Sequence, residues 1–307
     1  MTHAPLVVGL GEVLWDVFPD ARQPGGAPAN VGFQAGQLGG RGAVASRIGV
    51  DDLGDELHAY LDQRRLDLSA MQRDPDHPTG RVTVDVSDPH HPSYVIHENV
   101  AWDFIAADAA LLAIAAQADA ICFGSLAQRS PTSRASIHTA LAAARPECLI
   151  VFDVNLRQHW WDADVVTRSV EASQIVKLNH EEVQTLAPLL NAPDDPIEFA
   201  RALLKRFGLR AVCITRAEHG CLLVSESESV DLPGIAVDVV DAVGSGDAFS
   251  AALIVATLCG WPLRCAGELA NRVGALVATR PGAMPDLRDE FDELLRQCAP
   301  QQATRHA

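Results

Sequence analysis

The sequence predicts an α/β fold in which a mostly parallel central sheet carries helices on both faces, with a small β-sheet lid beside it. Two observations lead to this prediction. Short apolar runs alternate with helical segments of about a dozen residues along most of the chain, a pattern typical of βαβ units. Residues 80–103 instead alternate single apolar and polar side chains, as expected of a hairpin with one solvated face.

Composition limits the class of protein and its partners. The chain has 307 residues, 48% of them hydrophobic, so we expect one large domain with a buried core. The net charge of −16 argues against nucleic acids and anionic membranes as partners, because both bind clustered Lys and Arg. Seven scattered cysteines without a CxxC pair indicate reduced thiols and a cytoplasmic location. The sequence shows neither signal-peptide features at its start nor an apolar run that could span a membrane.

The first third of the chain opens the expected sheet. Residues 6–10 are a short apolar run and predict a buried strand. Residues 28–38 have helical spacing and end at two glycines. A second strand is expected at 43–50 and a second helix at 51–65.

The lid is predicted from residues 12–24 and 80–100. Val82, Val84 and Val86 alternate with polar residues before a turn rich in proline. The histidines in and after this turn have no cysteine nearby, and we interpret them as solvated loop residues and not as metal ligands. These histidines are His90, His91 and His97.

The alternation of strands and helices resumes after residue 101. Each apolar run is followed by a segment with helical spacing, which predicts further parallel strands of the same sheet. The strands are expected at 120–126, 148–155, 175–179 and 211–216, and the helices at 133–144, 181–190 and 196–207.

A glycine turn near the end of the chain predicts an anion site. Gly244 and Gly246 flank Ser245, and Asp247 then opens an apolar helix that ends near Leu258. The first N–H groups of a helix lack partners within it, and glycines let the backbone direct them toward one point. We therefore expect an anion to be held by oriented amides and the helix dipole, without a lysine. Asp247 beside such a site could take a proton from an attacking hydroxyl, or could simply cap the helix.

A dinucleotide-binding turn at the start of the chain can be rejected. GLGEVL lacks the third glycine of GxGxxG, since Leu14 occupies that place. The acid expected about 20 residues further on is also missing.

Several motifs together carry a family resemblance. DAVGSGDAF resembles the C-terminal signature DTxGAGDxF of the ribokinase-like, or PfkB-type, carbohydrate kinases, and GGAPANVGFQAGQLG at 25–39 resembles their N-terminal signature. GEVLWDVFPD at 11–20 is similar to the opening of bacterial fructokinases. FDVNLR, KLNHEE, ITRAEHG and NRVGALVATRPGAMP follow in family order, so the resemblance covers nearly the whole chain. The chain departs from the pattern at Ala242, where threonine is usual, at Ser245, and at Arg216 with Ala217.

The resemblance implies a ribokinase-like three-layer α/β/α domain over residues 1–307 that closes its lid over a sugar. It implies an ATP-dependent kinase that uses Mg²⁺ and a monovalent cation such as K⁺, and that phosphorylates a primary hydroxyl, with fructose favoured. Kinases of 2-keto-3-deoxygluconate, ribose or a nucleoside remain alternatives, as does a non-catalytic sugar-binding regulator. We expect a homodimer formed through the exposed apolar face of the lid.

The resemblance also assigns site residues. Asp247 is expected to be the base, the amides of Gly244, Ser245 and Gly246 to stabilise the γ-phosphoryl group, and Arg157 to contact phosphate or sugar. The expected sugar contacts are Asp16, Gly25, Gly26 and Asn30, with Asp247. The expected nucleotide contacts are Thr215, Arg216, Gly220, Asn271, Gly244 and Gly246.

Two metal sites follow from the same resemblance. Asn179 and Glu182 lie on one face of a helix and are expected to hold Mg²⁺ through its waters beside the nucleotide, although this spacing also fits a capping box. A monovalent cation is expected at Asp241, at the carbonyls of Val243, Val277, Arg280 and Gly282, and at Asp286.

Overall fold

The computed structural model describes residues 4–85 and 93–300, and two sheets organise them. The strands of the large sheet are β1 (Leu6–Leu10), β4 (Arg41–Gly49), β5 (Met71–Asp74), β8 (Ala120–Phe123), β9 (Leu149–Asp153), β10 (Ile175–Asn179), β11 (Ala211–Thr215), β12 (Cys221–Ser225) and β13 (Ser229–Leu232). Those of the small sheet are β2 (Leu14–Val17), β3 (Arg22–Gly25), β6 (Gly80–Asp85) and β7 (Ser93–Ile96).

The large sheet is mostly parallel, which confirms the predicted fold class. Its strand order is β13-β12-β11-β10-β9-β8-β1-β4-β5, and only β12 and β13 run antiparallel to their neighbours. The chain builds outward from β1 in both directions, first to β4 and β5 and later to β8 and beyond. In open sheets of this kind, ligands bind outside the carboxyl ends of the strands next to such a reversal.

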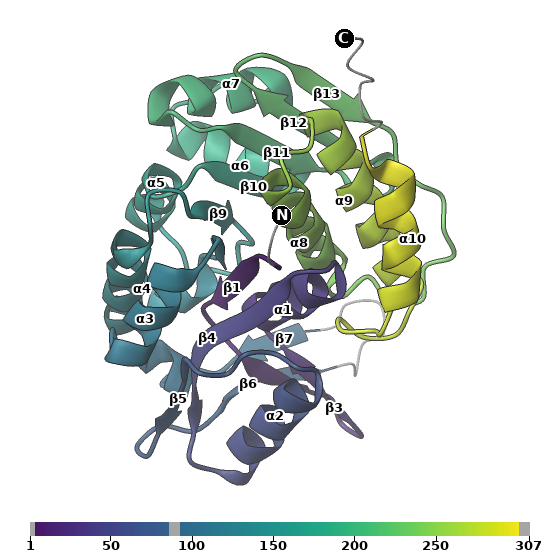
Figure 1. Ribbon diagram of the computed structural model, residues 1–307. Helices are drawn as coiled ribbons and strands as arrows, with labels where there is room; N and C mark the ends of the chain where they lie inside the picture. The colour runs from purple at the N-terminus through teal and green to yellow at the C-terminus, as the bar shows by residue number, and fades with distance from the viewer. Residues whose placement is uncertain (1–3, 86–92, 301–307) are drawn as a thin grey trace.

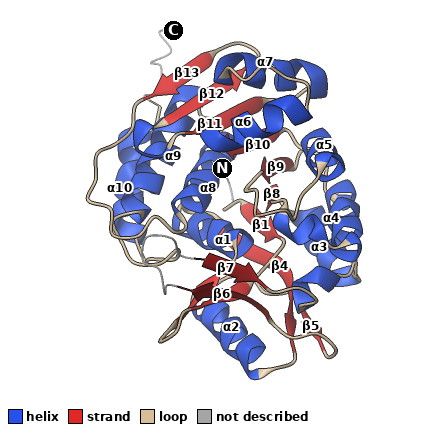
Figure 2. Ribbon diagram, turned by 180° about the vertical axis from the view of Figure 1, so that it is seen from behind, coloured by secondary structure: helices blue, strands red, loops and turns tan. Residues whose placement is uncertain are grey.

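Helices cover both faces of the large sheet and complete the three layers (Figure 1). The α-helices are α1 (Ala27–Gln37), α2 (Asp52–Gln63), α3 (Ala109–Gln117), α4 (Pro131–Ala143), α5 (Ala163–Glu171), α6 (His180–Leu189), α7 (Pro196–Phe207), α8 (Ser245–Leu258), α9 (Leu263–Val277) and α10 (Arg288–Cys298). Short 3-10 turns are η1 (Ala101–Phe104), η2 (Leu126–Arg129) and η3 (Ala217–His219). Helices α1, α8, α9 and α10 pack on one face and α3 to α7 on the other, and Figure 2 shows the same division from behind.

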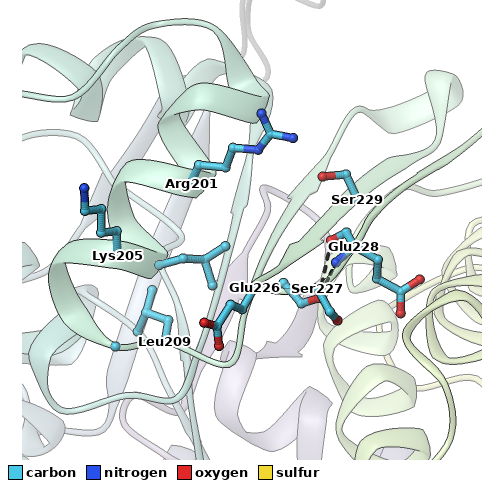
Figure 3. Close-up of a pocket in the computed structure, with 10 residues that line it drawn as sticks. Arg201, Lys205, Leu209, Glu226, Ser227, Glu228 and Ser229 are labelled. Carbon is cyan, nitrogen blue, oxygen red and sulfur yellow. Dashed lines mark hydrogen bonds between the residues drawn. The ribbon is translucent and has the colours of Figure 1, made fainter.

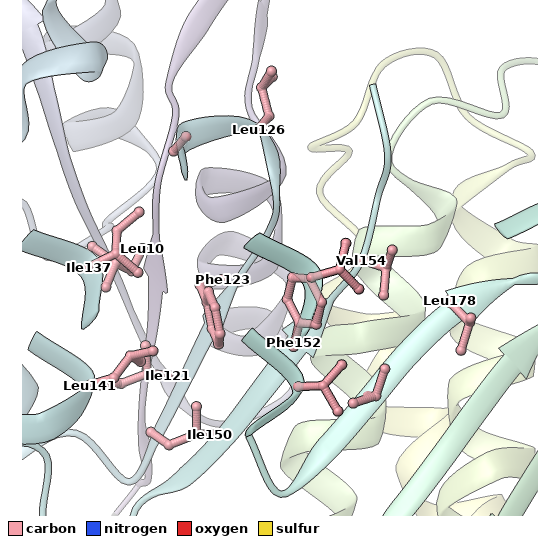
Figure 4. Packing of buried hydrophobic residues seen from close by; sticks show 14 of the residues in the cluster. Leu10, Ile121, Phe123, Leu126, Ile137, Leu141, Ile150, Phe152, Val154 and Leu178 are labelled. Carbon is pink, nitrogen blue, oxygen red and sulfur yellow. The ribbon is translucent and has the colours of Figure 1, made fainter. Parts of the chain in front are cut away.

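Side chains of each buried strand alternate between the two layers of core. Val8 of β1 packs with α3 to α7, whereas its neighbour Val7 packs with α8 and α9. Figure 4 shows the first of these layers, in which the rings of Phe123 and Phe152 stack with centroids 5.2 Å apart. Because both faces of the strands are buried, their sequences read as continuous apolar runs and not as alternating ones.

The small sheet forms the predicted lid. Its order is β3-β2-β6-β7, with β6 and β7 antiparallel as the alternating sequence predicts. It draws on the two expected segments, although β3 extends to Gly25. His90 and His91 lie outside the described residues, and His97 follows β7 and contacts the Thr83 hydroxyl at 2.8 Å. No helix among the described residues combines the length and the apolar character needed to cross a bilayer.

Candidate active site

Strands β1, β9, β10 and β11 bring their carboxyl ends to one edge of the sheet, where the N-terminus of α8 also lies. Glu12 follows β1, and Asp153, Asn179 and Thr215 are the last residues of the other three strands. Residues far apart in the sequence therefore meet at this edge, as the resemblance predicts for DAVGSGDAF, FDVNLR and KLNHEE.

The glycine turn before α8 adopts a conformation that other residues avoid. Gly244 is left-handed, with φ 78°, and a Cβ placed on it would lie 2.6 Å from Cα of Ala283. No side chain caps α8, and among the described residues no acceptor takes the N–H groups of Gly244 or Gly246. These two N–H groups are therefore free of acceptors within that part of the chain, and the anion that they would bind stays a prediction. The N–H of Ser245 differs, because it donates to the Ala242 carbonyl at 3.3 Å.

Asp247 lies in the first turn of α8 and is half-buried. Asn30 of α1 donates a hydrogen bond from Nδ2 to Oδ2 of Asp247 at 2.7 Å, so the structure joins the proposed base to a predicted sugar contact. Burial and the nearby Asp153 carboxylate raise the pKa of Asp247 to about 6, although Asn30, Lys177 and Arg157 act in the opposite direction. A carboxylate with this pKa is ionised at neutral pH and can accept a proton from an alcohol.

A buried lysine lies beneath the anion site, which corrects the expectation of a site without one. Nζ of Lys177 is 3.0 Å from both carboxylate oxygens of Asp153, and Ser250 of α8 donates to the same carboxylate at 2.7 Å. A Cβ placed on Gly246 would lie 3.1 Å from this ammonium group. Lys177 was not predicted as a site residue, although a lysine within an otherwise apolar strand is a signal that its charge has a buried partner.

The predicted sugar contacts lie where the lid meets α1. The carboxylate of half-buried Asp16 in β2 packs against Gly25, and a Cβ on that glycine would lie 2.5 Å from Asp16 Oδ2. Gly26 has φ 117° and passes so close to the backbone of Glu12 that a Cβ would lie 2.6 Å from its carbonyl oxygen. Burial raises the pKa of Asp16 to about 6, and the positive charge of Arg157 opposes this shift.

Arg157 supplies positive charge to the acidic side of the site. The Arg157 side chain is exposed, and its positive charge opposes the rise that burial causes in the pKa of Glu12, Asp16 and Asp247. Its guanidinium donates a hydrogen bond to the Leu156 carbonyl at 3.2 Å, and among the described residues no ion pair joins it to these carboxyl groups. This placement is compatible with the predicted contact to phosphate or sugar.

Asn179 and Glu182 form the capping box that was the alternative interpretation of their spacing. Asn179 Oδ1 accepts from the N–H of Glu182 at 2.8 Å, and Glu182 Oε2 accepts from the N–H of Asn179 at 2.7 Å. The other carboxylate oxygen of Glu182 accepts from the N–H of Leu156 at 2.7 Å. Burial raises the pKa of Glu182, and the hydrogen bonds from the N–H groups of Asn179 and Leu156 oppose this rise. The same bonds hold the carboxyl group in place beside the DVNLR loop.

Three predicted nucleotide contacts surround one loop, residues 232–234. Arg216 donates to the Leu232 carbonyl at 3.3 Å and also pairs with Asp231. Asn271 donates to the Pro233 carbonyl at 2.8 Å. Gly220 has φ 90°, and a Cβ on it would lie 2.1 Å from the Leu232 carbonyl oxygen. Thr215 lies apart from this group at the end of β11, with its hydroxyl 3.5 Å from the Leu178 carbonyl.

Asp241 links the two loops of the predicted monovalent-cation site. Its carboxylate accepts from the N–H of Val243 at 3.0 Å and from the N–H of Gly282 at 2.9 Å. The Val277 carbonyl accepts from the N–H of Arg280 at 3.0 Å. Asp286 is exposed, and within the described parts of the chain no hydrogen bond or ion pair joins it to this group. Across residues 4–85 and 93–300, no three His, Cys, Asp or Glu side chains form a cluster that could bind a metal ion.

A separate pocket lies at the amino end of β11, opposite the end that carries the candidate site. It has a volume of about 730 Å³ and lies between α7 and the turn joining β12 to β13 (Figure 3). Ser225 at this turn pairs with Ala211, the first residue of β11, whereas Thr215 at the other end of β11 marks the candidate site. The pocket is therefore remote from Asp247.

Comparison with known proteins identifies the class of this protein. The family model described as pfkB family carbohydrate kinase matches residues 11–290. The chain therefore belongs to the PfkB family of carbohydrate kinases, which are ATP-dependent phosphotransferases.

Named relatives lie at modest identity. The putative sugar kinase PH1459 of Pyrococcus horikoshii is 30% identical, with 95% of each chain covered, and its structure in complex with ATP gives a TM-score of 0.81 at 29% identity over 95% of this chain and 97% of that one. A fructokinase of Vibrio alginolyticus is 29% identical over 93% of this chain and 96% of its own. The structure of a double mutant of Vibrio cholerae fructokinase with fructose, ADP and potassium bound gives a TM-score of 0.80 at 25% identity, covering 95% of this chain and 98% of that one.

Proposed function

We propose that this protein is a fructokinase that transfers the γ-phosphoryl group of ATP to a primary hydroxyl of fructose. The observation that carries the proposal is the pairing of Asp247 with Asn30, which sets a carboxylate beside the free N–H groups at the start of α8. When a base and an anion site are adjacent, the base can deprotonate the attacking hydroxyl while the anion site holds the phosphoryl group that it attacks. Relatives named fructokinase support the choice of sugar.

Each residue of the site has a distinct part in this reaction. Asp247 takes the proton of the attacking hydroxyl, while Asn30 fixes the orientation of its carboxylate. The N–H groups of Gly244 and Gly246 stabilise negative charge on the moving phosphoryl group, with support from the α8 dipole. Asp16 and the backbone at Gly25 and Gly26 hold the sugar, and closure of the lid excludes water.

Mg²⁺ fits the site only through water. Both carboxylate oxygens of Glu182 already accept main-chain N–H bonds, so direct coordination would disturb the capping box with Asn179. Each oxygen keeps a lone pair that can accept from a metal-bound water, which suits an ion that keeps its hydration shell. When bound, Mg²⁺ would neutralise phosphate charge. Asn179 and Glu182 would orient its waters beside the nucleotide that Thr215, Arg216, Gly220 and Asn271 are proposed to bind.

A monovalent cation is proposed beside the anion site. Asp241 supplies a carboxylate between the two loops that hold Val243 and Gly282, and the Vibrio cholerae fructokinase structure contains a potassium ion. A cation there would rigidify the turn that presents the N–H groups of α8. Asp286 is the weakest member of the proposed ligand set, because nothing in its described contacts links it to Asp241.

The test of function is a coupled ADP-release assay over a panel of acceptors. The panel contains fructose, ribose, 2-keto-3-deoxygluconate and a set of nucleosides, with ATP and Mg²⁺ present. We expect the highest kcat/KM with fructose. A different preferred acceptor would replace fructose but keep the kinase, whereas no ADP release above the ATP-only rate with any acceptor would favour a non-catalytic sugar-binding regulator.

We also propose a cytoplasmic homodimer that forms through the lid. Tyr94 and Val95 of β7 are 53% and 55% exposed, and β7 is one of the two edge strands of the lid. An exposed apolar edge strand offers main-chain groups and apolar area to a second copy.

Sedimentation velocity at micromolar concentration is expected to give a dimer. The double substitution Tyr94→Ser and Val95→Lys should shift it to the monomer, because it places a charge on the proposed interface. The matched substitution Val50→Lys, at an equally exposed position outside the lid sheet, should leave the dimer intact. A monomer from the unsubstituted chain would refute the dimer.

A further inference from the structure

Glu12 is a buried carboxyl group in the candidate site that the roles above do not use. It follows β1 and is only 4% exposed. Its Oε2 is buried and has no hydrogen-bond partner in the part of the chain that the structure describes, and the same is true of Oδ1 of Asn30. Burying a carboxyl oxygen without a donor is unfavourable, so the fold keeps these two acceptors at a cost in stability.

The surroundings of Glu12 place it among the sugar contacts. Its carbonyl oxygen abuts Gly26, the residue that precedes α1, and Asn30 lies one turn further along that helix. The charged groups that act on the Glu12 carboxyl are Arg157 and Asp247. Burial raises the pKa of Glu12 to about 7, against the opposing effects of its own N–H, Arg157 and the N–H of Ala27.

In its ionised form, Glu12 lacks a hydrogen-bond donor at Oε2. The phosphates of ATP offer only acceptor oxygens and would repel the ionised carboxyl group, so they do not supply this donor. A salt bridge to Arg157 does not form, since within the described residues no ion pair joins Glu12 to any cation. Hydroxyl groups can donate to carboxylate and amide oxygens, and a polyol carries several of them.

We infer that Glu12 determines acceptor specificity by taking a hydrogen bond at Oε2 from a hydroxyl other than the one that is phosphorylated. Oδ1 of Asn30 takes a second hydroxyl, so the substrate class is a polyol with at least two hydroxyls besides the reacting one. This inference rests on the proposed function. It adds that acceptors lacking the hydroxyl opposite Glu12 are poor substrates even when their reactive group is intact.

The test combines variants with deoxy analogues. Kinetics are measured for the wild type, Glu12→Gln and Glu12→Ala with the best acceptor of the panel and with each of its monodeoxy analogues. In the wild type, one analogue should lose about ten- to a hundredfold in kcat/KM, the effect of one hydrogen bond to a buried carboxyl group. In Glu12→Ala, KM for the acceptor should rise by a similar factor, KM for ATP should stay within about twofold, and the penalty on that analogue should disappear.

Controls separate this inference from the proposed function. Glu147→Gln changes an exposed acid just before β9, at the opposite edge of the sheet, and should leave every constant unchanged. If Glu12→Ala fails to fold, the isosteric Glu12→Gln is judged alone and should discriminate less well against the same analogue. An unchanged acceptor KM and unchanged analogue penalties in an active Glu12 variant would overturn the role of Glu12 while the kinase remains. A wild type that phosphorylates no acceptor would overturn both.

Discussion

Substituting Asp247 by asparagine is expected to lower kcat by about a hundredfold to ten-thousandfold, the usual contribution of a general base. The side chain keeps its size and can still bond to Asn30, so the fold and the α8 N–H groups should be unaffected. Binding of ATP, measured by calorimetry, should change by less than about threefold. The rate is followed by ADP release with the preferred acceptor.

The pH dependence of kcat/KM, measured for the wild type and for Asp247→Asn, provides a second test of the role of Asp247. The pKa of Asp247 is raised to about 6, so kcat/KM of the wild type should fall about tenfold for each unit of pH below 6 as the base becomes protonated. Glu12, with a pKa of about 7, and Asp16, with a pKa of about 6, titrate in the same range. The fall in kcat/KM at low pH that is due to Asp247 should be absent from the pH profile of Asp247→Asn and present in that of Glu12→Gln.

The exposed acid Asp289 on α10 is the control for this prediction. Asp289→Asn makes the same chemical change far along the chain from the glycine turn and should have wild-type kinetics. An Asp247→Asn variant that turned over at the wild-type rate would show that another group removes the proton. The α8 turn would then retain only its part in binding phosphate.

The sequence predicted the parts of this fold that depend on local pattern. The strand at Leu6–Leu10 and the helix at Pro196–Phe207 have the expected bounds, because an apolar run or a capped amphipathic segment identifies each one by itself. Helix α4 begins at Pro131 and not at residue 133, since proline is well suited to the first turn of a helix. The strands β5 and β13 were not predicted, because they are short edge strands in which apolar and polar residues are mixed. The strand β12 was also not predicted, although its sequence CLLVS is an apolar run.

The candidate site was predictable where a motif has a local geometric reason. Gly244 requires a left-handed backbone, and Asn179 with Glu182 completes a capping box, so both can be inferred from spacing. The contact of Asn30 with Asp247 spans 217 positions, and only the family resemblance could bring these residues together before the fold was known. Glu12 and Lys177 were missed because their importance comes from burial, which depends on the three-dimensional packing around them.

Lys177 gives the second large effect that we expect. Nζ lies 3.0 Å from both oxygens of Asp153, and the two residues are 8% and 4% exposed. Lys177→Met would leave the Asp153 carboxylate buried without its counter-ion directly beneath the phosphate-binding turn. Breaking one half of a buried ion pair typically costs about 3–5 kcal/mol, and we expect a loss of that size in the free energy of unfolding. Urea denaturation measures it, and Lys205→Met, at the other lysine of the chain and exposed on α7, should cost little.

The double variant Lys177→Met with Asp153→Asn separates stability from catalysis. It removes both charges and keeps an oxygen to accept from Ser250, so most of the lost stability should return. Activity should stay at least about tenfold below the wild type, because the ammonium group nearest Gly246 no longer contributes positive potential to the phosphoryl group. Full recovery of activity together with stability would mean that Lys177 only neutralises Asp153. Recovery of stability without recovery of activity would show that Lys177 assists the backbone N–H groups of α8 in stabilising the negative charge of the phosphoryl group.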